Sequence, residues 1–86
     1  MALTFNIGEC PICRGYGLLE ILYNFDENSC SIMCDNCLTE WNKPEDALKN
    51  FNGFRKSYQK VEARGATRED IEEVGWEKYV VNWLNI

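Results

Sequence analysis

Four of the five cysteines in this 86-residue chain form two Cys-x-x-Cys pairs, Cys10 with Cys13 and Cys34 with Cys37. A single turn of this type supplies two thiolates to a metal, and tetrahedral zinc needs four such soft ligands. The sequence therefore predicts one structural Zn²⁺ site, with iron in a rubredoxin-like site as the alternative. A redox dithiol is disfavoured, because thioredoxin-type motifs carry one Cys-x-x-Cys rather than two.

The residues that usually carry catalysis are scarce. The chain has no histidine, so a general base would have to be a carboxylate or a lysine. No serine, and no cysteine outside the two pairs, has a recognisable partner for nucleophilic catalysis. A four-thiolate site is also closed, with no position for an activated water. We therefore expect a protein that is not an enzyme.

The fifth cysteine, Cys30, lies four residues before Cys34. By strand parity the two share one apolar face, so we expect Cys30 to be a buried and inert thiol. A replacement metal ligand and a sensor thiol are the alternatives.

The two pairs must be positioned by the segments between them. Apolar residues alternate over 18–25 and again over 29–34, and residues 26–29 have the composition of a turn. With a four-residue loop, Phe25 would face Cys30, and both apolar sets would lie on one face of a hairpin. Alternation also predicts short strands on either side of the hairpin, one containing Leu3, Phe5 and Ile7 and one over residues 38–41.

Helical periodicity begins after the second pair. Asn42 and Glu45 have the spacing of a capping box, with Pro44 in the first turn, and one helix over 43–64 is the economical prediction. A break at Asn52-Gly53 is the alternative; within one helix, Gly53 would face solvent. The helix has two opposed arcs: apolar Ala47, Phe51, Phe54, Tyr58 and Val61, and basic Lys49, Lys56, Lys60 and Arg64.

Gly65 would end that helix, and a second one is predicted to start at Thr67 and to end or kink at Gly75. Helical spacing then recurs in Trp76, Tyr79, Val80, Trp83 and Leu84. The predicted fold class is α+β. We expect one domain over 1–86, with a small zinc-ribbon β-sheet in 1–42 and two or three helices packed on it from 43–86.

Charge suggests the class of partner. The net charge is −5, and a basic band over 49–68 separates acidic blocks over 1–48 and 69–86. This sign disfavours nonspecific nucleic-acid binding and favours a basic protein partner. The basic arc would be the contact if the partner were nucleic acid, and solvated helix faces are the alternative for both surfaces. The candidate partner-binding acids are Glu69, Asp70, Glu72, Glu73 and Glu77, followed by Asp26 and Glu27 at the hairpin tip.

The chain shows neither a secretory leader nor an apolar run as long as a membrane span. We therefore expect a cytoplasmic protein, with thiols kept reduced and no membrane contact.

The stretch from Cys10-Pro11-x-Cys13 to Cys34-Asp35-x-Cys37-x-x-x-Trp41 resembles the zinc-ribbon group over roughly residues 8–42. Ribbons of this kind serve transcription factors, ribosomal proteins and adaptors, so the resemblance implies a metal-bound fold rather than one activity.

The whole layout is also similar to small acidic bacterial immunity proteins encoded beside polymorphic or contact-dependent toxins. This resemblance rests on the two Cys-x-x-Cys segments, the first knuckle with Cys10 and Cys13 and the second knuckle with Cys34 and Cys37, together with the tail segments 66–71 and 75–79. It implies an inhibitor that binds a toxin, often a nuclease, and covers its active or substrate-binding surface. The alternative function is a nucleic-acid-binding or transcription-associated zinc-ribbon adaptor.

Overall fold

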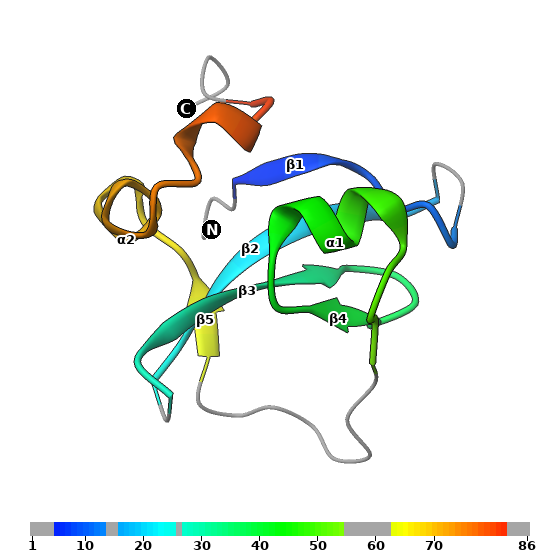
Figure 1. Ribbon diagram of the computed structural model, residues 1–86, viewed down its shortest axis with the longest axis horizontal. Helices are drawn as coiled ribbons and strands as arrows, with labels where there is room; N and C mark the ends of the chain where they lie inside the picture. Colours follow the sequence, from blue (N-terminus) through cyan, green and yellow to red (C-terminus); the bar gives the residue numbers. More distant parts are fainter. Residues whose placement is uncertain (1–4, 14–15, 26, 55–62, 83–86) are drawn as a thin grey trace.

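The computed structural model describes residues 5–13, 16–25, 27–54 and 63–82, and its centre is a five-stranded antiparallel sheet (Figure 1). The α+β class is confirmed in this broad sense. In chain order the elements are β1 (Asn6–Glu9), β2 (Leu18–Asn24), β3 (Ser29–Cys34), β4 (Glu40–Trp41), α1 (Pro44–Lys49), β5 (Ala63–Gly65), α2 (Arg68–Val74) and the 3-10 helix η1 (Glu77–Tyr79).

The sheet is built around β2. Strands β1, β2, β3 and β4 are neighbours in that order, and β5 pairs with β2 as well. Because β3 pairs along the whole of β2, β5 must share the opposite edge of β2 with β1. The first half of the chain therefore supplies four strands. Strand β5, from the second half, pairs with the part of the β2 edge that β1 does not occupy.

The β2–β3 hairpin forms as predicted, but its predicted register is wrong by two residues. Cys30 pairs with Tyr23 rather than Phe25, and Cys34 pairs with Leu19. The turn begins one residue earlier than expected and includes Asn28 in the left-handed conformation, at φ 51°. A shift of two residues leaves every side chain on the same face, so the expected apolar face is retained.

The long helix predicted over 43–64 is wrong. Helix α1 begins at Pro44, in the first turn as expected, but it ends at Lys49 and is capped by Asn50 at φ 54°. The first cap also differs from the prediction, because the N-cap residue is Lys43 and no side chain caps the helix. Asn52, at φ 61°, has a second left-handed backbone that is incompatible with a continuing helix.

The chain after α1 returns to the sheet instead. Phe54 forms an isolated antiparallel bridge with Glu40 of β4, and residues 55–62 lie outside the described part of the chain. Arg64 and Gly65 then belong to strand β5, so Gly65 does not end a helix. Of the basic arc, only Lys49 is on a helix; Arg64 is on a strand, and Lys56 and Lys60 fall within the segment that is not described.

Helix α2 agrees closely with the prediction. Thr67 is the N-cap, and its hydroxyl accepts a hydrogen bond from Asp70 N at 3.2 Å, while an Asp70 carboxylate oxygen accepts one from Thr67 N at 2.9 Å. Gly75 ends the helix in the left-handed conformation, at φ 77°. Beyond it, Val80 is buried and Trp76 is half-buried, whereas Trp83 and Leu84 lie outside the described residues.

One core unites the sheet with both helices. Trp41 of β4 is completely buried, and Ala47 of α1 and Ile71 of α2 belong to the same apolar cluster. Gly53 packs against Trp41 rather than lying on a solvent face of a helix, because a Cβ placed there would be 2.7 Å from Trp41 Nε1. The described part of the chain holds no helix long and apolar enough to cross a membrane.

Candidate metal centre

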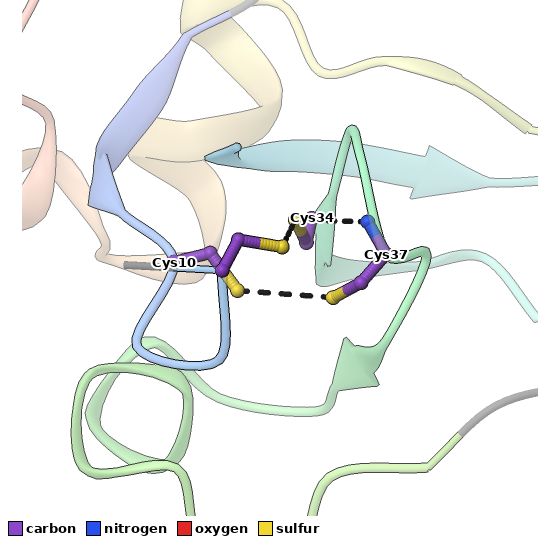
Figure 2. A group of neighbouring side chains, drawn as sticks. Cys10, Cys34 and Cys37 are labelled. Atoms are coloured by element: carbon purple, nitrogen blue, oxygen red, sulfur yellow. Dashed lines mark hydrogen bonds between the residues drawn. The ribbon is translucent and has the colours of Figure 1, made fainter. Parts of the chain in front are cut away.

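The two cysteine pairs lie at neighbouring chain reversals at one end of the sheet. Cys10 and Cys13 follow β1, and the loop closes through a hydrogen bond from Cys10 N to Gly17 O at 2.9 Å. Cys34 ends β3, and Cys37 lies in the turn that leads to β4. Figure 2 shows Cys10 facing Cys34 and Cys37 across the space between these two knuckles.

The four sulfur atoms have the separations that a metal centre requires. All four Sγ atoms lie within 4.8 Å of one another. The Cys10–Cys37 Sγ distance is 3.8 Å, and the Cys13–Cys34 Sγ distance is 3.6 Å. Tetrahedral zinc with Zn–S bonds of about 2.3 Å places its sulfur atoms about 3.8 Å apart. The predicted set of four cysteines is therefore brought together, and its donors fit a four-thiolate metal ion.

The ligand set has a buried side and a half-exposed side. Cys10 and Cys34 are buried in the apolar core, whereas Cys13 and Cys37 are half-buried at its margin. Metal binding would thus attach both knuckles directly to the core.

Gly17 makes room for the cluster. A Cβ added at this residue would be 2.5 Å from Cys34 Sγ and 2.9 Å from Asn36 Cβ, closer than non-bonded atoms can approach. The reason for glycine here is the close approach of the backbone to a ligand sulfur.

Backbone and side-chain donors surround the sulfurs. Cys34 Sγ accepts hydrogen bonds from Asn36 N at 3.3 Å and from Cys37 N at 3.4 Å. The Asn36 amide also donates to Cys13 Sγ at 3.4 Å, and Thr39 Oγ1 lies 3.3 Å from Cys37 Sγ. The bonds accepted by Cys34 and Cys13 favour charged thiolates, because a thiolate accepts hydrogen bonds more strongly than a thiol. The Cys37 thiol instead donates to Thr39 Oγ1.

In the metal-free chain the thiols of Cys10, Cys34 and Cys37 differ in pKa. Burial raises the pKa of Cys34 to about 12 and outweighs its backbone hydrogen bonds. Burial also raises the pKa of Cys10. At Cys37 burial alone would raise the pKa, but hydrogen bonds from Thr39 and from the neighbouring thiols lower it to about 6. Cys37 is therefore the thiolate that is ready at neutral pH, while Cys10 and Cys34 must lose protons to a metal.

Cys30 lies apart from the metal centre. It is buried on β3 four residues from Cys34, a distance of about 13 Å along a strand. Burial is the main cause that raises its pKa, to about 11. The metal-competent group found among the described residues contains the other four cysteines. The prediction of a buried strand thiol is confirmed.

None of the predicted partner-binding acids that the structure describes belongs to the four-cysteine group. Glu69, Glu72 and Glu73 are exposed on α2, and Glu77 is exposed in η1. Asp70 is only half-exposed, because it caps α2 and forms an ion pair with Arg64 at 2.7 Å. In the hairpin turn Glu27 is exposed, and Asp26 is outside the described residues.

Sequence reasoning missed two residues whose side chains contact the cluster, Asn36 and Thr39. Their signal was positional. Asn36 lies inside the second Cys-x-x-Cys, and Thr39 follows it by two residues, at positions where a side-chain donor can turn back to a ligand sulfur.

No protein-family model, curated protein or solved structure matches this chain.

Proposed function

We propose that this chain is a non-enzymatic zinc-ribbon protein, in which Zn²⁺ is structural and the surface binds a basic protein partner. The observation that supports zinc most is the set of four sulfur atoms within 4.8 Å of one another. Soft thiolates select zinc or iron, and a closed four-thiolate site leaves no position for a reacting water. The chain would therefore act by binding rather than by catalysis.

The four thiolates would have a structural role because they join two separate parts of the sheet. Cys10 and Cys13 belong to the β1–β2 connection, and Cys34 and Cys37 belong to the β3–β4 connection. A structural zinc site contributes about 10 to 16 kcal/mol at neutral pH, more than a core of this size supplies alone. Folding of the ribbon would then depend on the metal.

Elemental analysis of the purified full-length chain tests this proposal. We expect one zinc per chain, bound by four thiolates, and loss of the strand signal in circular dichroism when a chelator removes it. A red protein with thiolate-to-iron absorption would favour the iron alternative. Absence of any bound metal, with the fold intact, would refute the structural role.

The candidate surface for a partner is the outer side of α2. Glu69, Glu72 and Glu73 are exposed, whereas Ile71 on the opposite side of the helix is buried in the core. The net charge of the chain is −5. Such a surface would speed association with a basic partner and would disfavour acidic ones.

The hairpin tip lies on the same side of the molecule as α2, away from the knuckles (Figure 1). Arg64 connects the two regions: its guanidinium stacks 5.4 Å from the Phe25 ring centroid and pairs with Asp70. Glu27 at the tip could therefore contact the same partner as Glu69 and Glu73. Asp70 itself is better regarded as a structural residue of this surface.

The resemblance to immunity proteins suggests a toxin domain, such as a nuclease, as the basic partner. Binding would cover its active or substrate-binding surface, and no reaction would be required. A standard interface takes about 800 Å² from each partner, which is about one-seventh of the 5685 Å² exposed here. One charged side of the molecule is large enough for that contact.

Charge reversal tests the partner surface. The probe is the protein that cross-links to this chain in its native cells, produced recombinantly and measured by calorimetry at low and high salt. Glu69→Lys with Glu73→Lys should weaken binding at least several-fold, most at low salt. The matched control, Glu9→Lys with Glu45→Lys, changes two exposed acids elsewhere by the same charge.

Equal affinity of the α2 variant, the control and the unchanged chain would refute the α2 surface. Salt-dependent binding of a fluorescent mixed-sequence RNA or DNA would instead favour the nucleic-acid adaptor. Mutation of Lys49 would then be the first test of a basic contact surface, because Lys49 is exposed at the end of α1.

A further inference from the structure

The sulfurs of Cys13 and Cys37 each have a hydrogen-bond partner on a side chain. The amide Nδ2 of Asn36 lies 3.4 Å from Cys13 Sγ, and the hydroxyl Oγ1 of Thr39 lies 3.3 Å from Cys37 Sγ. These are the two half-buried ligands on the exposed side of the site. Because these two partners are side chains, a substitution can remove them. A backbone N–H that bonds a sulfur cannot be removed in this way.

We propose that Asn36 and Thr39 are positioning residues of the metal centre, which stabilise its thiolates by hydrogen bonding and so set the affinity and electronic state of the site. This inference rests on the proposed metal binding, and it concerns residues that are not ligands.

Asn36 holds the two knuckles together. Its backbone N–H donates to Cys34 Sγ at 3.3 Å, and its side chain donates to Cys13 Sγ, so one residue bonds sulfurs from both pairs. Those two sulfurs are only 3.6 Å apart. Two negatively charged thiolates at that distance repel each other, and donors shared between them reduce the repulsion.

Thr39 acts on one sulfur from a fixed position. In the metal-free chain the Cys37 thiol donates to Thr39 Oγ1. A metal-bound thiolate carries no proton and can only accept, so metal binding would require the Thr39 hydroxyl to turn and donate to Cys37 Sγ. Thr39 is 5% exposed. Its Cγ2 faces Gly53, where a Cβ would be 3.0 Å away, so the side chain is held by packing as well as by its hydrogen bond. A buried donor with a fixed rotamer is pre-organised for the thiolate.

The test uses cobalt(II) as the probe metal in the full-length chain, because thiolate-to-cobalt charge-transfer bands report directly on the sulfur atoms. Thr39→Val removes the hydroxyl and nearly keeps the shape, and Asn36→Leu and Asn36→Asp remove the amide donor. Loss of a donor raises the energy of the thiolate electrons, so the bands should shift to longer wavelength. Metal affinity, measured by chelator competition, should fall about 10- to 100-fold.

Two controls separate hydrogen bonding from other effects. Thr39→Ser restores the hydroxyl, so its band position and affinity should be close to those of the unchanged chain. Asn42→Leu and Asn42→Asp make the same changes at an exposed asparagine with no sulfur contact among the described hydrogen bonds, and should have no effect.

Unshifted bands in Thr39→Val and both Asn36 variants would overturn the inference, even if affinity fell, because a purely structural effect would lower affinity without changing the sulfur electronics. A shift in Asn36→Asp without one in Asn36→Leu would also contradict it, since added charge rather than the lost donor would be the cause. If the unchanged chain binds cobalt without a four-thiolate spectrum, the proposed metal centre itself fails.

Discussion

The Cα atom of Gly17 lies so close to Cys34 that a methyl group on it would be 2.5 Å from the ligand sulfur. Gly17 is held in place by the start of β2. There, Leu18 O accepts a hydrogen bond from the N–H of Asp35, which lies in the second Cys-x-x-Cys segment. Neither side can move away without breaking the connection between β2 and the second knuckle.

Gly17→Ala is therefore expected to displace Cys34 Sγ and to weaken metal binding by at least about 10-fold, because a misplaced ligand loses its bond geometry. Chelator competition with the purified variant measures this. Retention of full affinity would mean that the knuckles adjust freely around residue 17.

Gly53→Ala changes a residue whose added Cβ would meet Trp41 and Thr39 Cγ2 rather than a sulfur atom. Because the new methyl group would clash with the buried Trp41 ring, we expect the free energy of unfolding to fall by about 1 to 3 kcal/mol. Denaturant titration of the metal-loaded chain measures it, and the metal content should stay at one per chain. Within an exposed helix the same substitution would raise stability by about 1 kcal/mol, so the sign of the change distinguishes the two structures.

Cys30 and Cys34 should respond differently to the same substitution. Cys30→Ala removes a buried sulfur from the core and should cost about 1 to 2 kcal/mol of stability while the metal stays bound. Cys34→Ala removes a ligand and should lose both metal and fold. Elemental analysis and circular dichroism of the two variants side by side check this, and equal metal loss would place Cys30 in the site.

The pH dependence of metal binding follows from the thiol pKa values. Burial raises the pKa of Cys10 above its ordinary value of 9.0, and that of Cys34 to about 12, so both carry protons at neutral pH that a metal must displace. Apparent affinity should rise with pH by at least about 100-fold per unit between pH 7 and 9. Below pH 6 Cys37 is protonated as well, which adds one further proton, and the slope should steepen.

Chelator competition over this pH range, or calorimetry in buffers of different ionisation enthalpy, counts the protons released. Fewer than two protons at pH 7 would contradict the burial of Cys10 and Cys34 as the cause of their raised pKa values.

The parts of the structure that sequence could predict are those fixed by local chemistry. Cys-x-x-Cys spacing predicted the four cysteines that lie together, because one turn determines each pair. Thr67, Asp70 and Gly75 gave the limits of α2, because caps act on neighbouring backbone groups. The hairpin face was predictable from alternation, but its register depended on which residues formed the turn, and parity cannot distinguish registers that differ by two.

The segment after α1 was not predictable by periodicity. Ala47, Phe51 and Phe54 have helical spacing, yet Asn50 and Asn52 adopt left-handed conformations and Phe54 pairs with β4. The signal available for a helix end was Asn50 with Asn52 and Gly53, because asparagine and glycine adopt the left-handed conformation in which many helices end. Strand β5 is three residues long, too short for any alternation to reveal, and its position is set by a distant strand.

The short outer strands of the sheet have a consequence for aggregation. On one side, β1 and β5 divide the edge of β2 between them; on the other, β4 has two residues, and Glu40 already exchanges two backbone hydrogen bonds with Phe54. Among the described residues, the folded chain thus presents little continuous edge to a second molecule. The most apolar pair, β2 and β3, lies inside the sheet, between the two knuckles and the hairpin turn. Release of the metal would uncover that pair first, so the apo-chain is expected to self-associate through β2 and β3.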